Sequence, residues 1–285
     1  MTRKLAGLDD ILAYIETGAP VVINTSGGKD SQLTYLRVRA LLAHLGRLDQ
    51  LWIVHADLGR VEHDNTIAEI HDQLIDDDRL DVVSAIFKDG SPKDLINMIR
   101  RKAATLKAQG RHDVPPVPDA VNRTCTSDLK RGPVEVYIRN KVLGATKGSG
   151  LVINVLGFRA EESEDRAQTV EKPVEENTRL SRHGPRVDRT VINWYPLADF
   201  TVDEVFDGIH AFGQRAWSGY IQEGGGNTRK SCVFCILGCK TDWEYGATIR
   251  PELAKELSDL EEEIGFTLLN GQSVKQRLVD VLEIA

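Results

Sequence analysis

The sequence lacks a long apolar run. None of its stretches approaches the roughly 18 consecutive apolar residues that a membrane-spanning helix requires. The amino-terminal segment carries acidic side chains where a signal peptide would be apolar. We therefore expect a cytoplasmic protein without a membrane segment.

An excess of positive charge is also missing. The chain has 36 lysines and arginines against 43 aspartates and glutamates, which gives a net charge of −7. A chain of this balance has no general positive field to attract nucleic acid, so a polyanion must be bound locally. The basic clusters at 100–102, 130–131 and 179–189 are candidate phosphate contacts, although most such runs are solvated faces.

Cysteine is scarce, with four residues in 285. Together with the 41% hydrophobic composition, this excludes a disulfide-rich miniprotein, a fibrous repeat and a disordered chain. Cys232, Cys235 and Cys239 fall close together, whereas Cys125 is distant in the sequence. In a reducing compartment, clustered cysteines indicate metal ligands or catalytic thiols.

Apolar runs alternate with segments of helical spacing along most of the chain. This pattern predicts an α/β fold with a doubly wound, mostly parallel sheet. The polar stretch 160–190 has no periodicity and is expected to be a long surface excursion. We expect a first domain at 1–218 and, at 219–285, a Cys-rich metal-binding segment with carboxyl-terminal helices. The expected strands are 21–25, 51–59, 81–87, 151–158 and 191–200, and the expected helices are 31–45, 62–76, 92–109, 128–143, 201–212 and part of 251–285.

The string SGGKDS at 26–31 stands between the first expected strand and helix. Its glycines allow a phosphate to approach the backbone, the helix amides face an anion, and the lysine adds a positive charge. A plain glycine turn is the structural alternative, and the Walker A spacing is absent. We expect the nucleotide contacts here to come from Ser26, Gly27, Gly28, Lys29, Asp30 and Ser31.

This string resembles the PP-loop of the ATP pyrophosphatases, which cleave ATP between the α- and β-phosphates and leave an adenylylated substrate. GFRAEES at 157–163 is similar to the GxRxxES motif of the phosphoadenosine phosphosulfate (PAPS) reductase branch. CTSDLK at 125–130 is similar to the C-T-x-x-L-K segment of that branch. The resemblance extends over residues 20–240 and implies an adenine nucleotide alpha hydrolase-like fold.

Several further residues acquire expected roles from these motifs. Arg159 is suited to bind a phosphate or sulfate through two parallel hydrogen bonds, and Lys130 is suited to bind the same anion as a point charge. Glu162 is expected to orient Arg159 or to help hold Mg²⁺, and a surface ion pair is the alternative for all three. Asp57 is expected to contact the ribose or adenine, or to cap the next helix, and Gly157 is expected at the nucleotide. The expected catalytic residues are Lys29, Asp30, Arg159 and Lys130.

The CxxCxxxC array predicts a metal centre. Cys232, Cys235 and Cys239 would supply three thiolates and Cys125 the fourth. The apolar residues between the ligands favour a [4Fe–4S] cluster, with zinc as the alternative. A second alternative makes Cys125 a nucleophile that carries sulfur.

The cysteine pattern guides the choice among relatives. PAPS reductases carry a cysteine in a carboxyl-terminal tail, whereas the given sequence has none after Cys239. Adenylyl-sulfate reductases use a tandem cysteine pair, but Cys125 is single. The chain therefore looks most like the DndC/SspD type of DNA phosphorothioation proteins. A PAPS or APS reductase and a tRNA thiolation enzyme remain alternatives.

The resemblance to the DndC/SspD type also implies cofactors and partners. ATP and Mg²⁺ would be bound at the loop, and a cysteine desulfurase would donate sulfur. Other phosphorothioation proteins would be partners, DNA would be the substrate, and the chain could form a homodimer.

Overall fold

The computed structural model describes residues 3–145, 150–269 and 271–279. The chain divides into two compact units because it leaves the sheet after its second and third strands and returns each time. The first unit comprises Met1–His55, Thr66–Val83 and Val134–Trp217. The second comprises Ala56–Asn65, Ser84–Pro133 and Ser218–Ala285. The second unit contains two earlier segments besides Ser218–Ala285, and the expected division into domains at 1–218 and 219–285 stays a prediction.

A six-stranded, mostly parallel sheet forms the centre of the first unit, as the alternating pattern predicts. Its strand order is β3-β2-β1-β4-β6-β5, and only β5 is seen to run antiparallel, against β6. The order reverses between β1 and β4, and open α/β sheets bind ligands at such a point, beyond the carboxyl ends of the strands. The strands are β1 (Val21–Thr25), β2 (Leu51–Asp57), β3 (Leu80–Ser84), β4 (Leu151–Val155), β5 (Val174–Glu176) and β6 (Thr190–Trp194).

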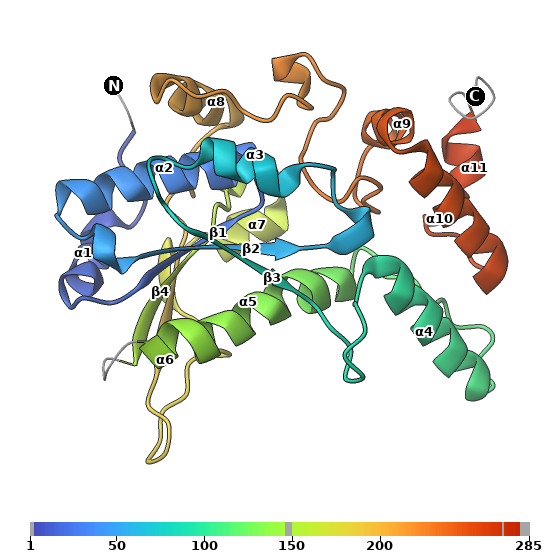
Figure 1. Cartoon of the computed structure of the whole chain (residues 1–285), viewed down its shortest axis with the longest axis horizontal. Coiled ribbons are helices and arrows are strands. Elements are labelled where there is room, and N and C mark those ends of the chain that lie inside the picture. Colours follow the sequence, from blue (N-terminus) through green and yellow to red (C-terminus); the bar gives the residue numbers. More distant parts are fainter. Residues whose placement is uncertain (1–2, 146–149, 270, 280–285) are drawn as a thin grey trace. The chain divides into compact units, whose positions relative to one another are not determined.

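Helices lie on both faces of this sheet (Figure 1). Gly208 of α8 allows close packing on α2, since a Cβ atom there would lie 2.8 Å from Cδ1 of Leu33. Trp52 of β2 meets Tyr137 of α5 on the other face, with ring centroids 6.4 Å apart. The helices of this unit are α1 (Leu8–Glu16), α2 (Lys29–His44), α3 (Thr66–Gln73), α5 (Gly132–Tyr137), α6 (Leu143–Ala145), α7 (Glu164–Thr169) and α8 (Val202–Ala211).

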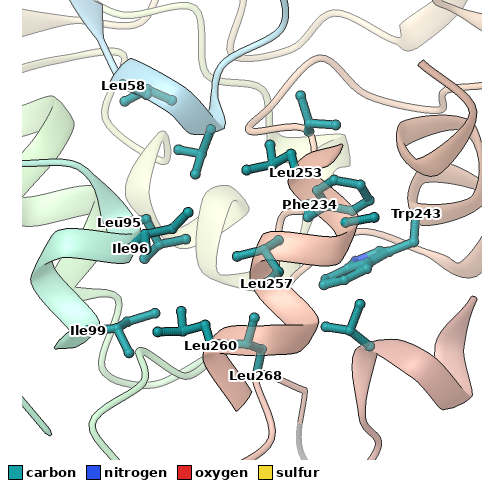
Figure 2. Packing of buried hydrophobic residues seen from close by; sticks show 14 of the residues in the cluster. Leu58, Leu95, Ile96, Ile99, Phe234, Trp243, Leu253, Leu257, Leu260 and Leu268 are labelled. Atoms are coloured by element: carbon teal, nitrogen blue, oxygen red, sulfur yellow. The ribbon is translucent and has the colours of Figure 1, made fainter. Parts of the chain in front are cut away.

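The second unit has a separate apolar core, shown in Figure 2. Leu95, Ile96 and Ile99 of one helix pack in the same cluster as Leu257 and Leu260 of another. The main helices are α4 (Leu95–Ala108), α9 (Lys240–Ile249), α10 (Pro251–Ile264) and α11 (Val274–Arg277). The expected carboxyl-terminal helices are therefore present, while residues 280–285 lie outside the described residues.

Two segments differ from the expectation. The stretch 160–190 is not irregular throughout, because it contains η5 (Ala160–Glu162), α7 and β5. The helix expected at 128–143 alternates between π and α geometry, with π turns η3 (Thr126–Arg131) and η4 (Ile138–Val142). Short 3₁₀ turns complete the fold: η1 (Leu48–Gln50), η2 (Gly59–Val61) and η6 (Ile221–Glu223). Among the described residues, every helix is too short or too polar to cross a lipid bilayer.

Candidate functional site

The phosphate loop, residues 26–31, joins β1 to the start of α2. Gly27 has a φ of 70°, a left-handed conformation that favours glycine. Gly28 is the N-cap residue of α2, and no side chain there caps the helix. The first amides of a helix have no partner within it, and the helix dipole makes that end positive. The start of this 16-residue helix is therefore suited to an anion.

The loop is held in shape by its own side chains. Oγ of Ser31 donates to the carbonyl of Gly28 at 2.9 Å and accepts from the amide of Ser26 at 3.1 Å. Gln73 of α3 donates through Nε2 to the carbonyl of Gly27 at 2.9 Å. Ser31 thus links both ends of the turn, which explains why a small hydroxyl residue follows the lysine and aspartate.

A buried charge network lies at the first turn of α2. Lys29 is 8% exposed, and its Nζ lies 2.9 Å from Oδ2 of Asp30. Arg159 is 4% exposed, and its Nε donates to Oδ1 of Asp30 at 2.6 Å. Burial lowers the pKa of Arg159, but Asp30, Glu161 and Glu162 together outweigh burial, so the pKa is raised. Asp30 is therefore shared between two cations, which is how buried charges are tolerated.

The GFRAEES segment packs directly on this turn. A Cβ atom at Gly157 would lie 2.9 Å from the carbonyl oxygen of Asp30, so the close approach requires glycine. Burial raises the pKa of Glu162, and the negative charge of Asp30 raises it further. The structure thus brings Asp30, Gly157, Arg159 and Glu162 together, although they are far apart in the sequence.

Glu161 is a member of the network that the sequence did not identify. Its Oε2 accepts from Nη1 of Arg159 and from the amide of Val202, both at 2.6 Å. Nη1 of Arg159 also donates to the carbonyl of Phe200 at 3.1 Å. The position of Glu161 two residues after Arg159 was the available signal. With these partners, Arg159 orients Asp30, and its expected contact with a phosphate stays a prediction.

Asp57 and Lys130 belong to the second unit. Asp57 accepts from the amide of Gly59 at 2.8 Å and from the hydroxyl of Ser84 at 3.2 Å. The N-cap residue of the following turn is Leu58, so both roles expected for Asp57 stay predictions. The positive charge of Lys130 is a minor influence that favours the thiolates of Cys125, Cys232 and Cys235. Lys130 therefore lies in the neighbourhood of Cys232 and Cys235 as well as of Cys125 of its own motif.

Three of the four thiols share that neighbourhood. The pKa of Cys235 is lowered to about 5, chiefly because its thiolate accepts a hydrogen bond from the thiol of Cys232. The same hydrogen bond raises the pKa of Cys232 well above its usual value. Burial raises the pKa of Cys125, and the charge of Cys235 adds to the effect. All four cysteines are free thiols.

Helix α9 supports the cysteine segment. Nε1 of Trp243 donates to the carbonyl of Cys235 at 2.9 Å, and the Trp243 ring packs on Phe234 with centroids 5.1 Å apart. A Cβ atom at Gly246 of α9 would lie 3.0 Å from the carbonyl oxygen of Val233, so glycine allows the cysteine segment to pack closely against this helix. The backbone around the thiols is therefore fixed by packing.

The four free cysteines are the candidate donors for a metal centre. Soft thiolates are the ligands of both iron–sulfur clusters and zinc. Cys239, however, is exposed at the start of α9, with its amide bonded to Asp242 at 3.2 Å and its Sγ 3.9 Å from the hydroxyl of Thr228. In the described part of the chain, no three or more His, Cys, Asp or Glu side chains are arranged to hold a metal ion. The four-cysteine centre therefore stays a prediction, and no chemical step is derived through it.

Comparison with known proteins gives similarity to solved structures alone. No protein-family model and no curated protein matches the chain. Among solved structures, it is similar to the phosphate complex of phosphoadenylyl-sulfate (PAPS) reductase from Candida auris. The identity is 11%, the match covers 75% of this chain and 83% of that chain, and the TM-score is 0.42. A match at this level says nothing about activity.

Proposed function

We propose that the chain is an ATP pyrophosphatase that activates a substrate for sulfur insertion. The observation that carries this proposal is the phosphate loop at the start of α2, with Lys29 buried beside it. A helix amino terminus and a desolvated ammonium group both favour a phosphate that gains negative charge in a transition state.

The proposed reaction takes place at the α-phosphorus of ATP. An oxygen of the acceptor forms a bond to that phosphorus, the bond to the β-phosphate oxygen breaks, and pyrophosphate leaves. Lys29 and the loop amides stabilise the charge that develops on the phosphoryl oxygens. Arg159 and Glu161 hold Asp30, which in turn fixes the direction of the Lys29 side chain. Glu162 is the carboxylate that would help hold Mg²⁺.

We favour the DNA backbone phosphate as the acceptor. A persulfide supplied by a cysteine desulfurase would then attack that backbone phosphorus and expel AMP, and a second thiol would cleave the S–S bond, which leaves a phosphorothioate and a disulfide. Support comes from the combination of SGGKDS, GFRAEES, a single upstream cysteine and the CxxCxxxC array in one chain. A [4Fe–4S] cluster on Cys125, Cys232, Cys235 and Cys239, and other phosphorothioation proteins as partners, belong to this proposal.

Reduction of a sulfonucleotide is the second candidate. The observation that favours it is the hydrogen-bonded pair of Cys232 and Cys235, with the positive charge of Lys130 nearby. A thiolate in positive surroundings suits attack on an activated sulfur atom.

The loop is tested by exchange of labelled pyrophosphate into ATP. Lys29→Ala is expected to lower the exchange rate by roughly 100-fold or more, because it removes a buried positive charge at the phosphoryl group. Lys172→Ala is the matched control, since Lys172 is exposed in the same unit. Full exchange by Lys29→Ala would refute the loop assignment.

The acceptor is tested by two product assays. DNA incubated with the protein, ATP, cysteine and a cysteine desulfurase should contain phosphorothioate linkages by mass spectrometry. PAPS or adenylyl sulfate with thioredoxin should give no sulfite. Sulfite release without phosphorothioate would replace the first candidate by the second, and thiolated nucleosides confined to tRNA would indicate the tRNA enzyme.

A further inference from the structure

The chain between β5 and β6 projects from the first unit as a narrow loop, drawn in yellow to orange in Figure 1. We call residues 177–189 the arginine arm. Its two sides are joined by reciprocal backbone hydrogen bonds between Arg182 and Arg189, at 3.0 and 2.8 Å. At its base, the amide of Asn177 donates to the carbonyl of Val191 at 2.8 Å. The arm is thus an ordered ribbon, although sequence alone suggests an irregular excursion.

The arm departs from the charge of the chain. It holds four arginines and one aspartate, in a chain with a net charge of −7. Its only aspartate, Asp188, bonds His183 at 2.9 Å, and Glu176 bonds the same ring at 3.1 Å. The nearby carboxylates are therefore engaged with a histidine or, for Glu135, with Arg179.

Within the described part of the chain, three arginines of this region have no acidic partner. Arg182 and Arg186 of the arm, and Arg139 of η4, are exposed and form no ion pair with any residue that the structure describes. Burial lowers the pKa of Arg189, and the positive charges of Arg182 and Arg139 lower it further, so these guanidinium groups lie near one another. Unpaired arginines that repel one another form a natural site for phosphates, which they bind in a bidentate manner.

The position of the arm indicates the size of the ligand. The arm precedes β6, so it lies at the amino ends of the parallel strands, whereas the phosphate loop follows the carboxyl end of β1. The intervening strand β4 has five residues, so the two ends of the sheet are roughly 16 Å apart. The triphosphate of one nucleotide does not span that distance, but a chain of phosphodiesters does.

We propose that the arginine arm, together with Arg139, binds the phosphodiester backbone of a nucleic acid at the end of the sheet opposite the phosphate loop. This rests on the proposed function, since it supplies the local grip that a DNA acceptor requires in an acidic chain. Contacts of this kind position the polymer and carry no sequence preference.

The test compares two double variants by fluorescence anisotropy with a 30-nucleotide single strand, its duplex and the equivalent RNA. Arg182→Ala with Arg186→Ala removes two arm charges. Arg47→Ala with Arg111→Ala is the control, because it removes two exposed arginines elsewhere that also have no ion pair within the described residues. The arm variant should bind at least about tenfold more weakly, with a salt slope shallower by roughly 1.5, since each phosphate contact contributes about 0.7–0.9.

The possible results separate the two proposals. Equal affinity of both double variants, or no binding of any probe by the unmodified protein, would overturn the arm as a nucleic-acid site. Arg182→Lys with Arg186→Lys should retain most of the binding, and thermal unfolding checks that the variants fold. A stronger loss on RNA than on DNA would assign the arm to RNA. Failure of the proposed function appears separately, as absence of pyrophosphate exchange by the unmodified protein.

Discussion

The phosphate loop and the arginine arm both gather positive charge in the first unit, but they treat it in opposite ways. At the loop, Lys29 and Arg159 are buried and share Asp30. In the arm, Arg182 and Arg186 are exposed and have no acidic partner among the described residues. A buried charge must be paired to persist in the fold, whereas an exposed one is free to serve binding alone. Arginine therefore stabilises the fold at the loop, whereas the arginines of the arm are available to bind a ligand.

The largest difference is expected in stability. Arg159→Ala leaves Asp30 and Glu161 without their shared cation and should lower the free energy of unfolding by about 3 kcal/mol. Arg182→Ala should change it by less than about 0.5 kcal/mol, because an exposed arginine loses no buried contact. Urea unfolding of both variants measures the two changes in the free energy of unfolding. Equal decreases would contradict the difference between the buried and the exposed arginine.

The comparison between buried and exposed groups also predicts how stability depends on pH, and His63 is the buried histidine. The pKa of His63 is lowered to about 4, chiefly by burial and also by the charges of Lys230 and Arg250, against an opposing effect of Asp242. The unfolded chain then binds a proton that the folded chain does not, so stability is lost as the pH falls from about 6.5 towards 4. The loss from this group is at most about 3 kcal/mol.

His63→Gln provides the matched control for that loss. The variant should show a shallower decline of the unfolding free energy over the same pH range, because glutamine takes up no proton. An unchanged slope would mean that other groups cause the acid sensitivity.

An effect of intermediate size is expected on the pKa of the Cys235 thiol. Cys232→Ala should raise the pKa of Cys235 more than Lys130→Met does, because the hydrogen bond from Cys232 is the largest cause of the lowered value. The pH dependence of Cys235 alkylation, followed by peptide mass spectrometry, gives both pKa values. The reverse order would show that charge outweighs the hydrogen bond at this pair.

The smallest effect is expected at His183. Hydrogen bonds to Asp188 and then Glu176 raise its pKa, so the protonated ring stabilises the folded arm. This contribution is complete below about pH 6.5 and is lost as the pH rises through the raised pKa of the folded state. Titration of the ring by NMR should give a midpoint above that of a free histidine. A midpoint at or below that of a free histidine would show that protonated His183 does not stabilise the folded arm.

Local signals in the sequence predicted the loop and its flanking elements well. The β1, loop and α2 segments rest on neighbouring residues, and the helix expected at 201–212 is α8, which Thr201 and Glu204 cap. β5 was missed because it has three residues, two of them glutamates, at the edge of the sheet. Edge strands are stabilised by pairing with a neighbour, so their composition gives little warning.

Contacts between distant segments explain the other gaps. The expected phosphate contact of Lys130 stays a prediction, while its charge acts on thiols about a hundred residues further along the chain, which the sequence did not indicate. Motif spacing fixes which residues stand near one another only within a few turns of chain. The direct packing of Gly157 on Asp30 could be suspected from the motifs, but only the fold shows it.

The hydroxyl of Ser31 has a consequence for ligand entry. Because it bridges Gly28 and Ser26, the turn keeps its shape through bonds that form when the chain folds. The conformational entropy of the turn is therefore lost when the protein folds, and ordering the turn does not reduce the affinity for a ligand. A phosphate that arrives there meets a rigid receptor, so association should proceed at the rate of encounter, without waiting for the backbone to rearrange.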